Sequence, residues 1–309
     1  MTEQSPGDWR AVGGRLRNWG RWGRDDQRGT TNLISPEQVR VAANLVRRGV
    51  VFDLSIPLDS DGPQVGGDRS NPLRLMSIVG GMESARGDFR VNDDYVFMPL
   101  QAATQWDALA HVYYDSRLYN GVPEEAVTSA GAARLGIETQ SPGIVGRGVL
   151  LDIVRHLGRP WLEAGESVGS DLLQTVAARQ GVRIAAGDVL LLRTGWWRKY
   201  VEERNRSVFL AAEPGLNLSA CEWLRERDVA AVAADNWGLE AVPCEVPGED
   251  FPVHMVLIRD MGMMIGEMFD LEELAQDCAS DGVYEFFLSA PVMRFTGAVG
   301  TPVTPLAIK

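Results

Sequence analysis

Histidine is scarce in this sequence, although its side chain is the one best suited to metal binding and to proton transfer near neutral pH. The chain carries three histidines, at His111, His156 and His254. His156 follows an apolar run and precedes Gly158 and Pro160, so we expect it to be structural or exposed. A site that uses imidazole therefore depends on His111, on His254 or on both.

The segment that ends at His111 carries polar side chains at odd-numbered positions, namely Gln101, Gln105, Asp107 and His111. An extended chain would place them on one face. A helical turn would bring Asp107 and His111 together, because they are four residues apart. Either geometry lets a carboxylate and an imidazole converge. A satisfied polar network at the end of a strand explains the same pattern equally well.

A second pair of candidate residues follows much later, at His254 and Glu267. His254 lies in the mostly apolar segment 251–257, where a hydrogen-bonded core histidine is more common than a ligand. Glu267 follows the uncharged segment 262–266, and a carboxylate buried there needs a partner such as a metal ion or a histidine. Cys244 precedes His254 by ten residues. We find no third group that would orient a Cys–His nucleophile pair, so that alternative is weak.

The elements that must position these residues alternate between strands and helices. Residues 50–57 are expected to form a short apolar strand, and apolar runs of strand length at 146–154, 187–193 and 229–234 are typical of strands buried on both faces. Further strands are expected around 286–294, and residues 59–94 should form loops with short strands. This alternation predicts an α/β protein with a mixed sheet.

Helices are indicated by their start and stop signals. Ser35 is expected to cap a helix that has Pro36 at its first position and Gln38 three residues after the cap. Basic residues followed by Gly49 mark its expected end. Other helices are expected at 170–180, capped by Ser170 or Asp171, at 219–226 and at 270–278.

The composition excludes several classes of protein. The chain of 309 residues has a net charge of −12 and no dense run of lysine or arginine, which argues against nucleic-acid binding. No segment approaches the ~20 apolar residues that span a bilayer, and residues 1–30 contain no stretch typical of a signal peptide. The three cysteines are widely spaced and form no CxxC pair. We expect a cytoplasmic protein without membrane partners.

The residues singled out above resemble the motif of the cyclase family, which includes bacterial kynurenine formamidases and isatin hydrolases. The family motif is HxGTHxDxPxH, followed much later by a histidine and a glutamate about a dozen residues apart. Thr104, Asp107 and His111 match the motif, and His254 and Glu267 match the later pair. The wider similarity covers nearly the whole chain, with matching segments at 22–27, 53–55, 148–152, 193–196, 214–216, 235–237 and 300–303.

The chain departs from the family motif at four of its seven specified positions. Gln101 and Gln105 replace the histidines that help to hold one metal in two-metal members, Ala103 replaces the glycine and Leu109 replaces the proline. The resemblance therefore implies at most one ion, Zn²⁺ or Mn²⁺. Its expected ligands are Asp107, His111, His254 and Glu267. Gln101 and Gln105, with His111, would act on the substrate, for example by hydrogen bonding its carbonyl group.

Tryptophan is frequent, with nine residues, and several lie beside polar residues. Core or oligomer packing explains most of them, but Trp106 and Trp237, with Thr104, are candidates for binding an aromatic ligand. The resemblance implies a swivelling β/β/α-type single domain at residues 36–309, preceded by an N-terminal arm at 1–35 that would suit an interface. It also implies a homodimer or homotetramer that acts on a small molecule.

Three functions are compatible with the sequence. The first is a single-metal hydrolase of an amide, lactam, ester or lactone of a small aromatic compound. The second is a metal-free acid–base catalyst of a cyclisation, dehydration or isomerisation that uses His111 with Asp107 or His254 with Glu267. The third is a non-catalytic binder of small molecules.

Overall fold

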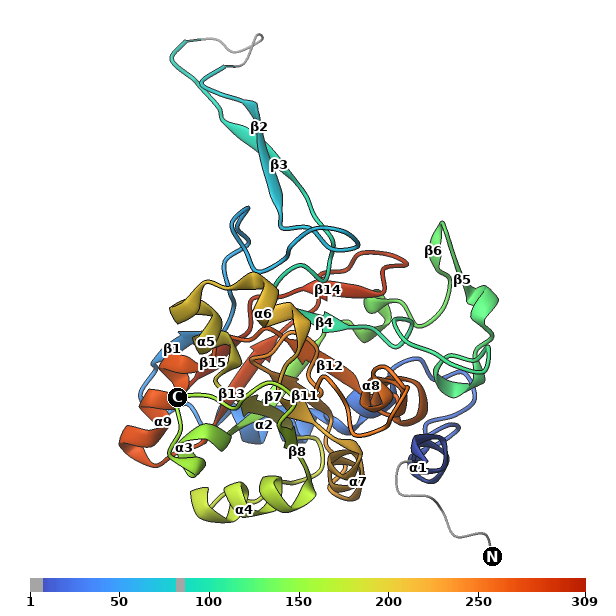
Figure 1. Ribbon diagram of the computed structural model, residues 1–309. Coiled ribbons are helices and arrows are strands. Elements are labelled where there is room, and N and C mark those ends of the chain that lie inside the picture. Colours follow the sequence, from blue (N-terminus) through green and yellow to red (C-terminus); the bar gives the residue numbers. More distant parts are fainter. Residues whose placement is uncertain (1–7, 82–86) are drawn as a thin grey trace, which may run out of the picture.

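The computed structural model describes residues 8–81 and 87–309. In these residues nine strands join one sheet at the centre of the molecule (Figure 1). The neighbouring strands β7, β9, β11 and β12 are parallel, and antiparallel strands extend the sheet on both sides. The predicted α/β fold with a mixed sheet is therefore confirmed. In spatial order the strands are β1 (Val51–Asp53), β15 (Leu306–Ile308), β13 (Glu285–Ala290), β7 (Ile144–Asp152), β9 (Val189–Arg193), β11 (Ala231–Ala234), β12 (Met264–Glu267), β4 (Gln105–Asp107) and β14 (Gly300–Pro302).

The sheet has an apolar core on each face. Strands β9, β11 and β12 are buried along their whole length, as expected for apolar runs covered on both sides. Side chains of α4 (Ser170–Gln180), α7 (Leu218–Glu226) and the π-helix η5 (Met255–Met261) join the core on one face. Side chains of α9 (Glu272–Asp281) join the core on the other. The face toward which a strand residue points therefore decides which core it enters.

The expected helices form, with differences at their ends. Helix α2 (Pro36–Ala43) begins with the predicted capping box of Ser35 and Gln38. It ends six residues before Gly49, because the N–H groups of Arg48 and Val50 donate to the Lys309 carbonyl and turn the chain into β1. Helix α4 has the expected bounds, but its N-cap is Gly169, and neither Ser170 nor Asp171 caps it.

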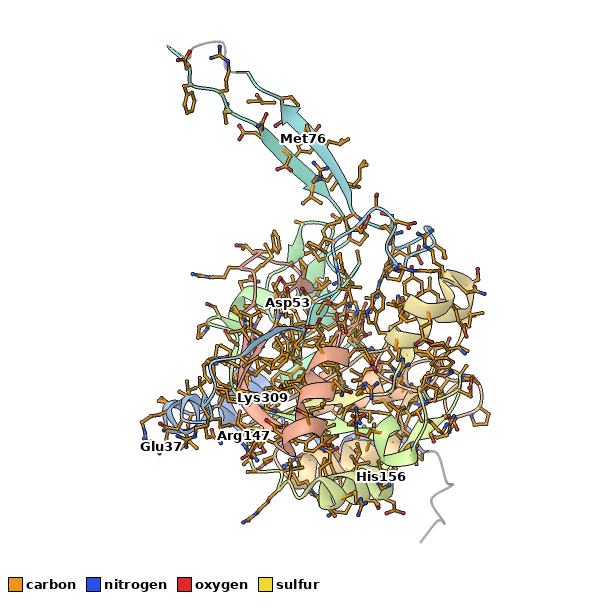
Figure 2. The ribbon with its side chains drawn as sticks, turned by 90° about the vertical axis from the view of Figure 1, so that its left-hand side faces the viewer. Glu37, Asp53, Met76, Arg147, His156 and Lys309 are labelled. Atoms are coloured by element: carbon orange, nitrogen blue, oxygen red, sulfur yellow. The ribbon has the colours of Figure 1, made fainter. Side chains whose placement is uncertain are left out.

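An antiparallel hairpin begins in the region 59–94, ends at Phe97 and projects from the body (Figure 1). Strands β2 (Leu73–Ile78) and β3 (Asp93–Phe97) are exposed on both faces apart from half-buried Ile78. Figure 2 shows Met76 on this hairpin, well away from the body. The hairpin carries apolar side chains that no other part of the described chain covers, and Phe97 is 74% exposed.

The predicted N-terminal arm is described from residue 8 onward, and it lies against the body. Helix α1 (Trp9–Leu16) packs on η5. Trp9 is buried and meets Tyr114 edge to face with ring centroids 4.7 Å apart. The Asn18 N–H donates to the Asp260 carbonyl at 2.9 Å. The described part of the arm therefore belongs to the same packed unit as the sheet.

The other described elements are short, and none of the helices in the described residues is long and apolar enough to cross a membrane. They are η1 (Gly29–Leu33), η2 (Tyr119–Gly121), η3 (Glu124–Ala126), β5 (Val127–Thr128), β6 (Gly131–Ala132), η4 (Ile137–Gln140), α3 (Ile153–Leu157), β8 (Ser167–Val168), α5 (Trp196–Glu203), α6 (Arg206–Ala211), β10 (Gly215–Leu216) and α8 (Pro252–His254).

Candidate metal centre

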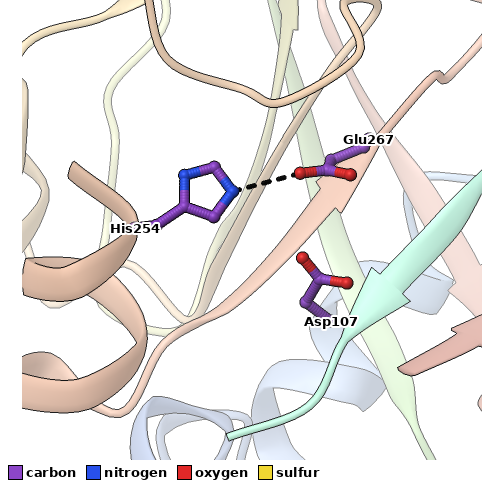
Figure 3. Close-up of side chains that lie close together, drawn as sticks. All are labelled: Asp107, His254 and Glu267. Atoms are coloured by element: carbon purple, nitrogen blue, oxygen red, sulfur yellow. Dashed lines mark hydrogen bonds and ion pairs between the residues drawn. The ribbon is translucent and has the colours of Figure 1, made fainter. Parts of the chain in front are cut away.

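Three potential metal ligands converge beside the edge of the parallel strands. Asp107 ends β4, Glu267 ends β12 and His254 ends α8. One ligand atom from each lies within 4.8 Å of the other two, and all three residues are buried. In Figure 3 the two carboxylates project from their strands toward the imidazole. Residues far apart in the sequence therefore form one cluster of nitrogen and oxygen donors.

The pairing of β4 with β12 explains how the carboxylates meet. Gln105 lies opposite Glu267 in this antiparallel pair, and Asp107 is two residues further along the same face. The Gln105 Nε2 donates to Glu267 Oε2 at 2.5 Å and approaches Asp107 Oδ1 at 3.5 Å. Among the described residues, Gln105 Oε1 and Asp107 Oδ2 are buried without a hydrogen-bond partner. The alternation expected for 101–111 thus holds within β4.

Glu240 orients His254 from behind. It accepts the backbone N–H groups of Val253 at 3.0 Å and of His254 at 2.8 Å, and it lies 2.6 Å from Nδ1 of the ring. Because a carboxylate accepts, Nδ1 carries a proton and donates. The other ring nitrogen, Nε2, is 3.2 Å from Glu267 Oε1. This arrangement matches the carboxylate–histidine pairs that orient metal ligands.

The electrostatics of the cluster favour a cation. Burial raises the pKa of Asp107 to about 6, with His111 opposing and Glu267 adding to the rise. Burial and then the charge of Glu267 hold the pKa of Glu213 well above its usual range. Burial lowers the pKa of His254, but hydrogen bonds to Glu240 and Glu267 outweigh it and raise this pKa to about 10. Buried carboxylates thus compete for too few positive partners.

The donor set fits a divalent metal ion. One imidazole and two carboxylates suit Zn²⁺ or Mn²⁺, and the unpartnered Asp107 Oδ2 is an orphaned acceptor of the kind that an ion would satisfy. The fourth predicted ligand, His111, lies just after β4, and its Nε2 is 3.7 Å from Asp107 Oδ2. It is beside the cluster of three donors but outside it.

A cavity of about 250 Å³ opens onto the cluster. His254 and Glu267 form part of its wall, with half-buried His111 and the aromatic rings of Trp237 and Phe251. Its size suits a small ligand. A larger cavity of about 520 Å³ lies between segment 55–58 and the C-terminal region, and none of the three donors lines it. We therefore take the smaller cavity as the candidate substrate site.

Three residues proposed from the sequence to contact the substrate have other surroundings. Trp106 points to the opposite face of β4, is fully buried and packs edge to face on Phe269 at 5.3 Å. The Thr104 hydroxyl donates to the Met268 carbonyl and accepts the Ile56 N–H. Gln101 precedes β4, and its Nε2 is buried without a partner in the described residues. Trp106 and Thr104 thus hold the strand rather than line the 250 Å³ cavity.

Two residues of the site were not predicted from the sequence. Glu240 lies fourteen residues before His254 in a loop, with no local pattern that distinguishes it from other acidic residues. Arg69 comes from the long polar region 59–94 and lines the cavity. A histidine in an apolar segment indicates that it has a buried partner, but the sequence does not indicate which residue that partner is.

The remaining candidates lie away from the cluster. The Cys244 thiol contacts the carbonyls of Val246 and Glu249 in its own loop. His156 lines a separate surface cavity and lies at the end of the molecule opposite the hairpin (Figure 2).

The sequence of the chain matches a known protein family. The model of the cyclase family matches residues 52–241, which is more than half of the chain. No curated protein gives a significant match.

Solved structures give two levels of similarity. A crystal structure described as a novel cyclase shares 44% identity, covers 95% of this chain and 100% of its own, and has a TM-score of 0.89. Isatin hydrolase A from Labrenzia aggregata, bound to benzyl benzoate, shares 19% identity over 86% of this chain and 95% of its own, with a TM-score of 0.61. A predicted metal-dependent hydrolase from Bacillus stearothermophilus shares 17% sequence identity over 84% of this chain and 98% of its own, with a TM-score of 0.56. The last two show the fold alone.

Proposed function

The chain belongs to the cyclase family, and from this membership and the geometry of the site we propose that it is a single-metal hydrolase. Its substrate is a small, aromatic amide, lactam, ester or lactone, and its ion is Zn²⁺ or Mn²⁺. The observation that carries the proposal is the convergence of Asp107, His254 and Glu267 within 4.8 Å. An ion held there would polarise the substrate carbonyl and lower the pKa of a water molecule.

The side chains have distinct parts in this reaction. Glu240 holds His254 so that Nε2 faces the cluster, and Gln105 holds Glu267 through its amide N–H. The hydroxyl of water adds to the acyl carbon and the proton of that water passes to His111; the C–N or C–O bond then breaks, and the leaving atom takes this proton. His111 lines the cavity next to Asp107 and is the candidate donor of that proton.

The residues of the cavity wall support the proposal that the substrate contains an aromatic ring. Trp237 and Phe251 offer flat apolar surfaces, and the volume of about 250 Å³ limits the ligand to a small molecule. Trp237 thus keeps its proposed role in substrate binding, whereas Trp106 faces the core.

One observation favours a metal-free catalyst as the second candidate. The Gln105 amide donates to Glu267 Oε2, and His254 Nε2 lies beside Glu267 Oε1. Both oxygens of a proposed ligand thus have protein partners. An ion bound to Glu267 would have to displace these partners or share the oxygens with them. Proton transfer by His111 and Asp107 would leave both contacts of Glu267 in place.

Metal content separates the two candidates. We would purify the protein without added metal, dialyse it against Zn²⁺ or Mn²⁺ and measure bound metal by elemental analysis. The test variant is His254→Ala, and the matched control is His156→Ala, which removes a histidine remote from the cluster. About one equivalent in the wild type and control, lost in His254→Ala, supports the hydrolase. No bound metal in the wild type would exclude it and leave the acid–base catalyst and the non-catalytic binder of small molecules.

We also propose that the protein works in the reducing cytoplasm and as a homodimer or homotetramer. Its three cysteines, all in described residues, are free thiols, and two of them are buried. The β2–β3 hairpin offers an apolar surface for a second copy of the chain, because an isolated two-stranded hairpin is only marginally stable in water.

A further inference from the structure

Arg69 places a positive charge in the wall of the candidate substrate cavity. It lies on the loop between β1 and β2, and its guanidinium stacks over the ring of Trp237 with 4.8 Å between the guanidinium carbon and the ring centroid. The charge is permanent, because arginine does not lose its proton in proteins. Neither the metal centre nor the proposed hydrolysis has so far required this residue.

The loop that carries Arg69 is held in place by side-chain hydrogen bonds. Asn71 accepts the Gln64 N–H and donates to the Gln64 carbonyl, both at 2.9 Å, which closes the loop on itself. The Gln64 side chain donates to the Ala102 carbonyl at 3.0 Å and accepts the Trp237 indole N–H at 3.4 Å. Trp237 is therefore fixed to the same loop on whose arginine it stacks. The guanidinium has a defined position over the cavity.

One nitrogen of this guanidinium lacks a hydrogen-bond acceptor. Its NH1 atom is buried and has no partner among the described residues. Glu267 Oε2, at 4.0 Å, is beyond hydrogen-bond distance and already accepts from Gln105. Buried charged donors are normally satisfied, because an unmade hydrogen bond costs the full loss of hydration. An acceptor supplied by a ligand would satisfy this nitrogen.

We propose that Arg69 is the anion-binding residue of this cavity and that the ligand is a small aromatic carboxylate. A carboxylate matches the planar fork of a guanidinium, and the rings of Trp237 and Phe251 suit an aryl group attached to it. This inference rests on the proposed function only for the location of the substrate. Acyl hydrolysis releases a carboxylate, so Arg69 binds either a carboxylate that the substrate carries or the one that the reaction forms.

Binding of matched probes tests the assignment without turnover. Benzoate and benzamide have the same shape and differ in charge, so the ratio of their dissociation constants reports the anion-binding group. We would measure both by calorimetry for the wild type, Arg69→Met and Arg69→Lys at equal metal content. The matched control is Arg74→Met, which removes an exposed arginine of the hairpin that pairs with Asp94.

The proposal predicts that Arg69→Met weakens benzoate binding by roughly 10-fold or more while benzamide binding stays within about 2-fold. Arg69→Lys should recover part of the benzoate affinity, because the charge remains and the fork is lost. The control should behave as the wild type. An unchanged ratio in Arg69→Met, or no benzoate binding by the wild type, would overturn the assignment.

Two further measurements keep the outcomes distinct. Thermal unfolding of each variant shows whether Arg69→Met is folded, and Arg69→Gln replaces it if it is not. Metal content of the same samples reports on the proposed hydrolase independently. If Arg69 only balances the charge of Glu267, its loss changes metal content or stability and leaves the ratio of the two probes unchanged, which contradicts anion binding.

Discussion

The Nδ1 atom of His254 lies 2.6 Å from the Oε1 atom of Glu240, and this contact directs the other ring nitrogen at Glu267. Both residues are buried, so water does not compete for the hydrogen bond. The same carboxylate also accepts the backbone N–H groups of Val253 and His254, which fixes the start of α8. One buried glutamate thus sets the position, the tautomer and the direction of the imidazole.

Replacing Glu240 should therefore weaken metal binding without removing a ligand. We expect Glu240→Gln to lower the affinity for Zn²⁺ by roughly 10–100-fold, because the uncharged amide no longer holds the proton on Nδ1 or raises the basicity of the ring. Competition with a chromophoric chelator measures the affinity. Glu249→Gln, on the neighbouring loop, is the control. Equal affinities for Glu240→Gln and the wild type would show that Glu240 is only structural.

Metal binding should release protons, because the shifted pKa values of two ligands leave them protonated in the metal-free protein. Hydrogen bonds to Glu240 and Glu267 outweigh burial and raise the pKa of His254 to about 10, and burial raises that of Asp107 to about 6. An ion must displace the His254 proton at any pH below about 10 and the Asp107 proton below about 6. Affinity should therefore rise with pH up to about 10, and more steeply below about 6.

Calorimetry in buffers of different ionisation enthalpy counts these protons. At pH 8 we expect release of about one proton per ion, and at pH 5 about two. No release of protons at pH 8 would mean that His254 is already neutral in the metal-free protein.

Restoring the family histidines should change the number of ions bound. Gln105 lies between the two carboxylates of the cluster, and Gln101 lies before the same strand. The resemblance to two-metal relatives predicts that a Gln101→His/Gln105→His double variant binds about two ions where the wild type binds about one. Elemental analysis of both proteins measures this. A stoichiometry that remains at about one would show that Ala103 or Leu109 also blocks the second site.

The buried position of Trp106 predicts a role in stability. A side chain at Gly266 would collide with the Trp106 ring, since its Cβ would lie 2.7 Å away. We expect Trp106→Phe to lower the free energy of unfolding by about 1–3 kcal/mol because it leaves a cavity. Urea unfolding measures this loss.

The affinity for benzamide separates Trp106 from Trp237. It should stay unchanged in Trp106→Phe and fall in Trp237→Phe, because only Trp237 lines the cavity. Weaker benzamide binding by Trp106→Phe at an unchanged free energy of unfolding would show that Trp106 takes part in substrate binding.

The exposed hairpin predicts self-association. Sedimentation velocity should show a dimer or tetramer for the wild type and a smaller species for Phe97→Asp, because Phe97 is 74% exposed on β3. Val201→Asp, at an exposed apolar position on α5, is the control. A monomeric wild type at micromolar concentration would contradict the assembly that we propose.

The sequence alone determined the fold class and most of the chemistry-bearing residues. Apolar runs such as 187–193 and the capping box at Ser35 are local signals, because side-chain alternation and capping depend on near neighbours in the chain. Asp107, His254 and Glu267 stood out by type, rarity and resemblance to a family motif. None of these signals depends on which strands are adjacent.

Tertiary structure decided how those residues meet. The pairing of β4 with β12 sets Gln105 against Glu267, and the same pairing turns Trp106 into the opposite core. Glu240 and Arg69 reach the site from loops that have no periodic pattern. Register, loop paths and the partners of buried charges depend on contacts between distant segments. These contacts form only when the whole chain packs, and for that reason the sequence could name the candidate ligands but not the groups that orient them.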